Sequence, residues 1–398
     1  MNNFEELPNN PFLPGHPISP DNFFGRKDDI TKIIRYFPRV VSQGIPEHFF
    51  VTGKRGMGKT SFVRYVARIA EEDYNMFPVY INNEGTNTIN ELITKLLDKL
   101  FKDFNKTNTG NEFIDSFFNH FNGINFGGLS FTFRQQPEIV ENVKDNFIEF
   151  LTDICDNLDG FDGIFIIIDD VNGLSESPEF ANWYKSTFET LEFYEHHVPI
   201  VFSLVTYPAK FDELCQQNPS FSRMFNLITM DKLEDDEVCD FFKTTFNSFD
   251  IRFENEQYLK DMVYYSWGMP LVMQQIGDAV FWNLEDKLIT EEIAYNGIRN
   301  SARELKNKPL KNVLKNVKNP HYNNILLKLG KNEKFSFKKE ELTVYLTDNE
   351  KKILSEFLKK MVEIDILDCV DDELEEYEFV NIVYFVYFLI SSTFNELL

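Results

Sequence analysis

The chain has 398 residues, 43% of them hydrophobic, and a formal net charge of -24 at pH 7. This length and apolar fraction allow a substantial core and two or three domains, whereas the charge opposes nonspecific attraction to nucleic acid or anionic membrane. The four cysteines are dispersed without a CxxC pair, and no apolar run reaches membrane-spanning length. We therefore expect a cytoplasmic protein with no disulfide framework, zinc site or membrane span.

The first 20 residues are rich in proline, which predicts an extended segment with little regular structure of its own. A glycine-rich stretch, Gly53–Thr60, then lies between a predicted strand at 48–51 and a helical pattern that begins at Ser61. It satisfies the phosphate-loop pattern G-x-x-x-x-G-K-S/T in the strand-loop-helix context that this pattern requires.

Each residue type in this loop has a role in phosphate binding. We expect the three glycines to adopt positive φ, so that successive N–H groups face an anion at a helix N-terminus. Lys59 is expected to contact the β- and γ-phosphates, and Thr60 to ligate Mg²⁺. The residues assigned to nucleotide binding in this segment are Gly53, Lys54, Arg55, Gly56, Met57, Gly58, Lys59, Thr60 and Ser61.

Apolar periodicity predicts alternating strands and helices after the loop. We expect strands at 78–81, 164–168, 199–206 and 227–229, helices at 89–101 and 139–158, and a small hairpin at 126–133. Strands that alternate with helices indicate a parallel sheet covered by helices on both faces, with ligands at the carboxyl ends of its strands.

Two of these strand ends carry candidate catalytic groups. Five apolar residues precede Asp169 and Asp170, which is a Walker B pattern. We assign Asp169 to Mg²⁺ and Asp170 to the orientation or deprotonation of an attacking water. Thr206 ends the next strand, where it either contacts the γ-phosphate or the water, or merely caps the strand.

The order of these motifs resembles that of AAA+ and STAND-type ATPases, most of all the archaeal ATPase branch that is similar to origin-recognition proteins. The segments that carry the resemblance are the two Walker motifs, Thr206, Phe24-Gly25-Arg26, Ser222-Arg223-Met224-Phe225 and Gly268-Met269-Pro270-Leu271.

The resemblance also implies roles for individual residues. Phe24 and Gly25 would flank the adenine, Pro270 would pack near it from a helical lid, and Arg223 would be an arginine finger. The second Walker B carboxylate is Asp170 where most AAA+ members carry glutamate, so hydrolysis would be slow.

The last third of the chain is predicted to be helical up to residue 318. Between Arg299 and Lys318, seven basic residues face a single glutamate. This segment is either a nucleic-acid patch or a solvated basic linker that docks on an acidic body, and the net charge favours the linker.

From residue 321, helices at 325–329, 338–346 and 349–362, followed by strands at 364–370 and 377–384, resemble a winged helix. Lysines 351, 352, 359 and 360 on its third helix could meet phosphates. The wing between the strands carries six carboxylates in eight residues (371–378), which favours docking to a protein over reading DNA.

We therefore predict a P-loop ATPase core at 21–230, after the extended segment 1–20, then a helical lid at 231–318 and a winged-helix-like domain at 319–398. The predicted function is an ATP- and Mg²⁺-dependent conformational switch that engages a protein partner or itself. Two alternatives stay open: an ATP-regulated, DNA-binding initiator of the origin-recognition type, and a nucleotide-gated interaction protein with negligible turnover.

Overall fold

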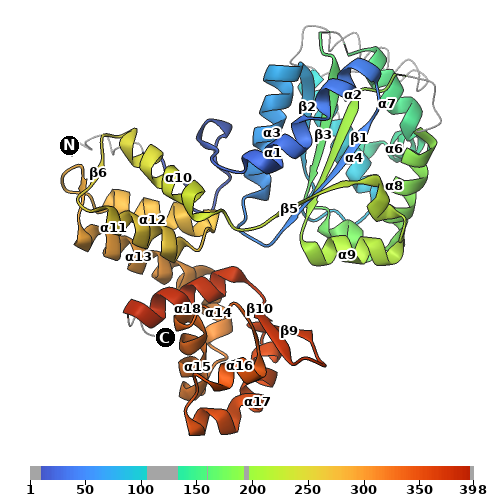
Figure 1. The fold of residues 1–398 in the computed structure, drawn as a ribbon. Coiled ribbons are helices and arrows are strands. Elements are labelled where there is room, and N and C mark those ends of the chain that lie inside the picture. The colour runs from blue at the N-terminus through green and yellow to red at the C-terminus, as the bar shows by residue number, and fades with distance from the viewer. Residues whose placement is uncertain (1–9, 105–132, 159, 192–196, 395–398) are drawn as a thin grey trace. The chain divides into compact units, whose positions relative to one another are not determined.

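The computed structural model describes residues 10–104, 133–158, 160–191 and 197–394 (Figure 1). They form two compact units. Unit 2 contains Ser19–Gly53 and Lys59–Met230, whereas unit 1 contains the chain up to Ile18, Lys54–Gly58 and the chain from Asp231 onward. Within the described residues, no helix is both long and apolar enough to span a membrane.

Unit 2 is built on a five-stranded sheet whose paired strands are all parallel. The strand order is β2-β3-β4-β1-β5, so β4 lies between β1 and β3. The strands are β1 (Glu47–Gly53), β2 (Met76–Asn82), β3 (Gly163–Asp169), β4 (Ile200–Thr206) and β5 (Asn226–Met230). The predicted parallel α/β fold is thereby confirmed, including the short fifth strand.

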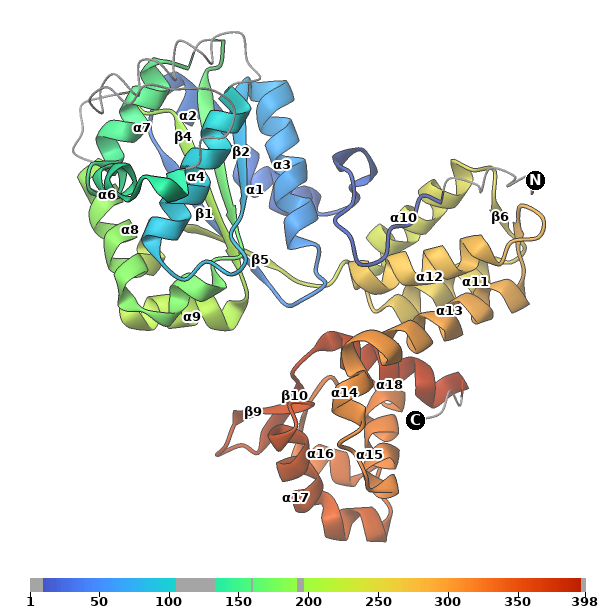
Figure 2. The ribbon, with the colours of Figure 1, turned by 180° about the vertical axis from the view of Figure 1, so that it is seen from behind.

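Helices cover both faces of this sheet (Figures 1 and 2). Alternate residues of β1, β3 and β4 point to opposite faces of the sheet, and both sets are buried almost throughout. Phe50, Ile166 and Phe202 join the large core beneath α4 and α6–α8. On the other face, the ring of Phe165 lies 5.6 Å from that of Phe37 in α2. This burial explains the continuous apolar runs in the sequence.

The described helices of unit 2 are α1 (Lys27–Ile34), α2 (Phe37–Gln43), α3 (Lys59–Tyr74), α4 (Ile89–Phe104), α6 (Pro137–Asp145), α7 (Phe147–Asp156), α8 (Pro178–Leu191) and α9 (Pro208–Gln217), with short 3-10 turns η1 (Pro20–Asn22), η2 (Phe133–Gln135), η3 (Asn172–Glu176) and η4 (Phe221–Met224). The hairpin predicted at 126–133 lies outside the described residues, apart from Phe133, which begins η2.

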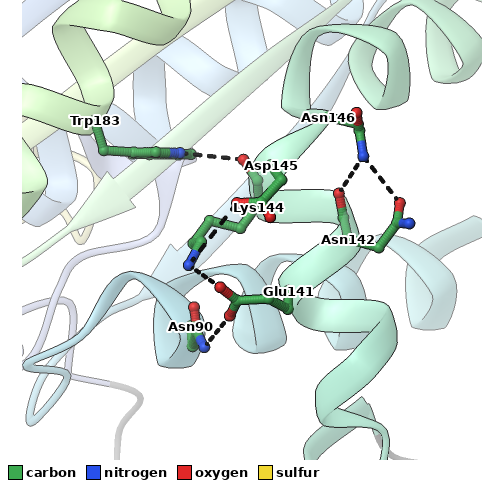
Figure 3. A network of polar contacts seen from close by, with 7 residues as sticks. All are labelled: Asn90, Glu141, Asn142, Lys144, Asp145, Asn146 and Trp183. Carbon is green, nitrogen blue, oxygen red and sulfur yellow. Dashed lines mark hydrogen bonds and ion pairs between the residues drawn. The ribbon is translucent and has the colours of Figure 1, made fainter.

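The helical pattern predicted at 139–158 is confirmed, but it forms two helices, because the chain breaks at Asn146 into α6 and α7 (Figure 3). The Asn146 side chain donates to the Asn142 carbonyl at 3.1 Å and satisfies a backbone acceptor at the end of α6. In the same network, Asn90 of α4 and Lys144 both bond Glu141, which ties α6 to α4. Periodicity continues across such a break, so the sequence pattern does not reveal it.

Unit 1 begins with helices that confirm the predicted helical content of 231–318, together with one short parallel strand pair that was not predicted. These elements are α10 (Asp235–Asn247), β6 (Arg252–Phe253), α11 (Glu256–Ser266), α12 (Pro270–Trp282), β7 (Leu288–Ile289), α13 (Glu291–Leu305), η5 (Lys306–Leu310) and α14 (Lys311–Leu314). The segment 299–318, which carries the seven basic residues, is thus mostly helical.

The proline-rich N-terminal segment packs on α10 through Phe12, whose buried ring lies 5.1 Å from that of Phe246.

The C-terminal part of unit 1 combines helices with a three-stranded antiparallel sheet of order β8-β10-β9. The elements are α15 (Pro320–Lys331), β8 (Ser336–Lys338), α16 (Lys339–Thr343), α17 (Asp348–Glu363), β9 (Leu367–Asp371), β10 (Glu376–Phe379) and α18 (Ile382–Phe394). The strand predicted at 377–384 is wrong after Phe379, since the chain turns into α18. This helix is buried around most of its circumference, so it lacks the polar face that would distinguish it from a buried strand.

Candidate functional site

The phosphate loop uses its glycines for two different reasons. Gly56 and Gly58 have positive φ, at 88° and 81°, as the sequence predicts. The same expectation for Gly53 is wrong, because it does not have positive φ. A Cβ at Gly53 would instead lie 2.7 Å from the Met230 carbonyl oxygen of β5, so a glycine is needed for close approach of the strands.

Lys59 begins α3 and is oriented by two neighbours in unit 2. Its Nζ donates to the Gly53 carbonyl at 2.5 Å and lies 4.3 Å from the ring centroid of Tyr207, which follows β4. The ammonium group therefore lies over the phosphate loop at a helix N-terminus. Positive charge and N-terminal amides together favour an anion there.

Thr60 and Asp169 meet although they are 109 positions apart in the sequence. The Thr60 hydroxyl donates to Asp169 Oδ2 at 2.7 Å, and Asp169 is only 8% exposed. A hydroxyl and a carboxylate side by side are hard oxygen donors, which is the ligand chemistry that Mg²⁺ requires. The residues present therefore fit the predicted metal ion.

Tyr80 is a site residue that the sequence analysis missed. Its hydroxyl, from β2, donates to the same Asp169 Oδ2 at 2.7 Å. In an apolar strand, the sequence pattern does not distinguish a tyrosine of the site from a tyrosine of the core. Its place near the carboxyl end of a strand next to β3 could have indicated its role, had the strand order been known.

Asp170 has a left-handed backbone conformation, with φ of 71°, and its Oδ1 accepts the Asn172 amide at 3.2 Å. Short side chains such as Asp and Asn tolerate this conformation because they bond the nearby backbone. The turn therefore accounts for aspartate rather than glutamate. Burial raises the pKa of Asp170, the Asn172 amide lowers it, and the negative charges of Asp169 and Glu84 raise it.

Thr206 is 2% exposed, and its hydroxyl donates to the Asn172 Oδ1. The sequence analysis assigned Thr206 either to the γ-phosphate or the water, or to a strand cap. Neither interpretation included the contact with Asn172. Asn172, another residue that the sequence analysis missed, thus links the end of β4 to the turn that follows Asp170. Asn83 closes the same turn, because its side-chain amide donates to the Asp170 carbonyl at 3.2 Å.

Residues Lys54–Gly58 of the loop belong to unit 1. A Cβ at Gly56 would lie 2.4 Å from Met269 Cε, and one at Gly58 would lie 3.8 Å from Pro270 Cγ. The predicted lid proline therefore lies beside the phosphate loop. Met57 is buried, and Arg55 is exposed.

Lys54 joins the loop to the C-terminal sheet. Its Nζ lies 2.9 Å from Glu378 Oε1 of β10 and 4.5 Å from the ring centroid of Phe335. The sequence interpretation gave Lys54 only a phosphate-loop role and did not foresee this pairing.

Three other site residues, Phe24, Gly25 and Arg223, have roles that only the resemblance implies. Phe24 and Gly25 lie between η1 and α1, and Gly25 has a positive φ of 74°. Arg223 is exposed on η4, where its guanidinium makes no hydrogen bond or ion pair with described residues. Their assigned roles stay predictions.

The conformation of Asp170 generates a stability prediction. We expect Asp170→Asn to leave the urea midpoint of unfolding unchanged, because Asn accepts the same amide and tolerates positive φ. Asp170→Ala should cost about 1 kcal/mol through backbone strain and loss of that bond. Equal stability of the two variants would contradict this explanation of the aspartate.

The sequence of this chain matches one protein-family model. Residues 22–181 match the family model described as "AAA ATPase domain". No curated protein matches the chain.

Among solved structures, a Walker-type ATPase of Pyrococcus abyssi is similar, with 16% identity, a TM-score of 0.55, and coverage of 92% of this chain and 96% of that one. The ORC2 protein of Aeropyrum pernix, in ADPNP-ADP complexes, has 10% identity, a TM-score of 0.54 and 97% coverage of both chains. The family model matches less than half of the chain, and the two solved structures show that this chain shares their fold.

Proposed function

We propose that the protein is a slow ATPase of AAA+/STAND character that binds ATP and Mg²⁺ and acts as a nucleotide-dependent conformational switch. The observation that carries this proposal is the convergence of Lys59, Thr60, Asp169 and Asp170 at one end of the parallel sheet. The ORC2 protein, whose fold is similar, is described in complexes with ADPNP and ADP.

Nucleotide binding in this proposal uses the loop amides and Lys59, whose Nζ would exchange the Gly53 carbonyl for a phosphate oxygen. Thr60 and Asp169 would hold Mg²⁺, which when bound neutralises phosphate charge. Because most of phosphoryl transfer is positioning and electrostatic stabilisation, the rigid attachment of these groups to β1, α3 and β3 supports catalysis.

Asp170 is the proposed base that orients or deprotonates the attacking water. Burial raises its pKa, which makes the carboxylate a stronger base than an exposed aspartate. Its backbone amide donates to the Val205 carbonyl at 3.0 Å, so the residue is fixed to β4. Its short side chain limits its reach, which supports slow turnover.

The proposed switch rests on the contacts of residues Lys54–Gly58 in the phosphate loop. Gly56 and Gly58 lie against the start of α12 and Lys54 pairs with Glu378 of β10, whereas Lys59 and Thr60 begin α3. A phosphate that reorders this loop would change the contacts of Lys54 and Gly56. The lid helices and the C-terminal sheet would then respond to the nucleotide.

The proposed catalytic roles predict two separable defects. Lys59→Ala should abolish ATP binding in isothermal titration calorimetry, because the loop loses its point charge for the phosphates. Asp170→Asn should retain ATP binding but lose turnover, by about 100-fold or more in phosphate release. Full hydrolysis by Asp170→Asn would remove the water-positioning assignment, and unimpaired ATP binding by Lys59→Ala would remove the site itself.

The proposed switch predicts a loss of coupling when the Lys54–Glu378 pair is broken. In the wild type, ATP should change amide hydrogen exchange in β8–β10. Glu378→Gln should reduce this change while ATP affinity falls less than about fivefold, because a half-exposed ion pair contributes about 1 kcal/mol or less.

Glu375→Gln is the matched control for this experiment, since Glu375, in the turn between β9 and β10, pairs with Lys339 of α16. It should leave the ATP-dependent exchange intact. An unchanged response in Glu378→Gln, or equal loss in both variants, would contradict a specific connection through Lys54.

We favour a protein partner over duplex DNA. The β9–β10 hairpin carries carboxylates on both sides of its turn, and its Val370 and Leu374 are more than half exposed. Such a surface suits a partner with basic and apolar side chains and repels phosphates. The alternative, an ATP-regulated DNA-binding initiator of the origin-recognition type, rests on the exposed lysines of α17 and on Lys311 and Lys315.

A binding experiment at low salt separates the two partner classes. We expect no fluorescence anisotropy change when the ATP-loaded protein is added to labelled duplex DNA at about 50 mM salt. Affinity that falls steeply with salt, and that Lys311→Glu with Lys315→Glu weakens, would favour the DNA-binding alternative.

A further inference from the structure

We infer that Tyr80 is a positioning residue that holds the metal-ligating carboxylate of Asp169 in place. The inference deepens the proposed function and rests on it, because it concerns the residues that would hold Mg²⁺. It assigns a role to a residue outside the two Walker motifs, supplied by the neighbouring strand β2.

The register of the sheet places the tyrosine hydroxyl at the metal ligand. Residues of β2 and β3 pair in parallel, with Tyr80 opposite Ile167 and Asn82 opposite Asp169. Tyr80 is thus two positions before the residue that pairs with Asp169, and its long side chain spans that offset. Its hydroxyl oxygen lies 2.7 Å from Asp169 Oδ2.

Asp169 Oδ2 consequently accepts two hydroxyl protons, one from Thr60 and one from Tyr80, each at 2.7 Å. Among the described residues, Oδ1 accepts no side-chain hydrogen bond. The two donors come from different elements, α3 and β2, so together they hold Oδ2 from two sides. Loss of one donor would leave this oxygen held from one side only.

The tyrosine itself is held on more than one side. The Arg64 guanidinium of α3 lies 5.4 Å from the ring centroid, and the strand backbone on either side of Tyr80 pairs with β3. A hydroxyl on a fixed ring is a better orienting donor than a water molecule, because no ordering entropy is lost when the metal ligand is aligned.

Hydrogen bonds to metal-ligating carboxylates commonly change metal affinity by 10- to 100-fold when they are removed. Tyr80→Phe deletes only the hydroxyl and keeps the ring, so it tests this bond with little change in packing. It should weaken binding of Mn²⁺, used as a spectroscopic probe for Mg²⁺, by about 10-fold in the presence of ADP, measured by electron paramagnetic resonance.

A second measurement separates metal positioning from a structural defect. ADP affinity measured in EDTA should be the same for the wild type and Tyr80→Phe, since the tyrosine contacts a metal ligand and not the phosphate loop. Unchanged Mn²⁺ affinity would overturn the inference. An equal loss of ADP affinity with and without metal would also overturn it, because that result indicates a general distortion.

Tyr295→Phe is the matched control. Tyr295 donates to Asp261 at 2.8 Å in unit 1, so its replacement removes a tyrosine-aspartate hydrogen bond of similar length that involves no proposed metal ligand. It should leave Mn²⁺ affinity unchanged. In the Asp169→Ala background, Tyr80→Phe should have no further effect on Mn²⁺ affinity, because its acceptor is gone.

The same binding measurements distinguish a failure of this inference from a failure of the proposed function. If the wild type binds neither ADP nor Mn²⁺ with ADP, the proposed function fails. If the wild type binds both and Tyr80→Phe binds Mn²⁺ equally well, only the role of Tyr80 fails.

Discussion

The hydrogen bond between Thr60 and Asp169 is the interaction on which the candidate site depends, because it joins the start of α3 to the end of β3. It requires parallel strands whose carboxyl ends reach the same edge of the sheet. Strand β4 lies between β1 and β3 and fixes the separation of the two Walker motifs. Tyr80 from β2 completes the arrangement, so consecutive strands of the sheet support one carboxylate.

The residues of the phosphate loop are divided between the two units. Gly53, Lys59 and Thr60 belong to unit 2, whereas Lys54–Gly58 belong to unit 1, where Gly56 lies close to Met269 and Lys54 pairs with Glu378. This division gives the proposed switch a physical basis, since a ligand that reshapes the loop acts directly on residues packed against other elements.

Much of the fold could be predicted from the sequence, because local pattern reflects burial. The strand ending at Asp169 is buried on both faces and reads as an apolar run, and α4 shows its apolar stripe at helical spacing. The positions of two boundaries could not be predicted, because the apolar pattern continues across them. Asn146 interrupts a periodic stretch, and the strand that ends at Phe379 is followed by apolar residues of α18.

The sequence by itself determined the phosphate loop, the Asp169–Asp170 pair and the order of strands and helices along the chain, since these depend on neighbouring residues. Only the tertiary structure decided which distant groups meet. Tyr80 reaches Asp169 because β2 and β3 are neighbours, and Lys54 pairs with Glu378 although 324 positions separate them. Such contacts follow from strand order and packing, which local periodicity does not encode. The requirement for glycine at Gly53 has the same origin, because it arises from the Met230 carbonyl of a strand far along the chain.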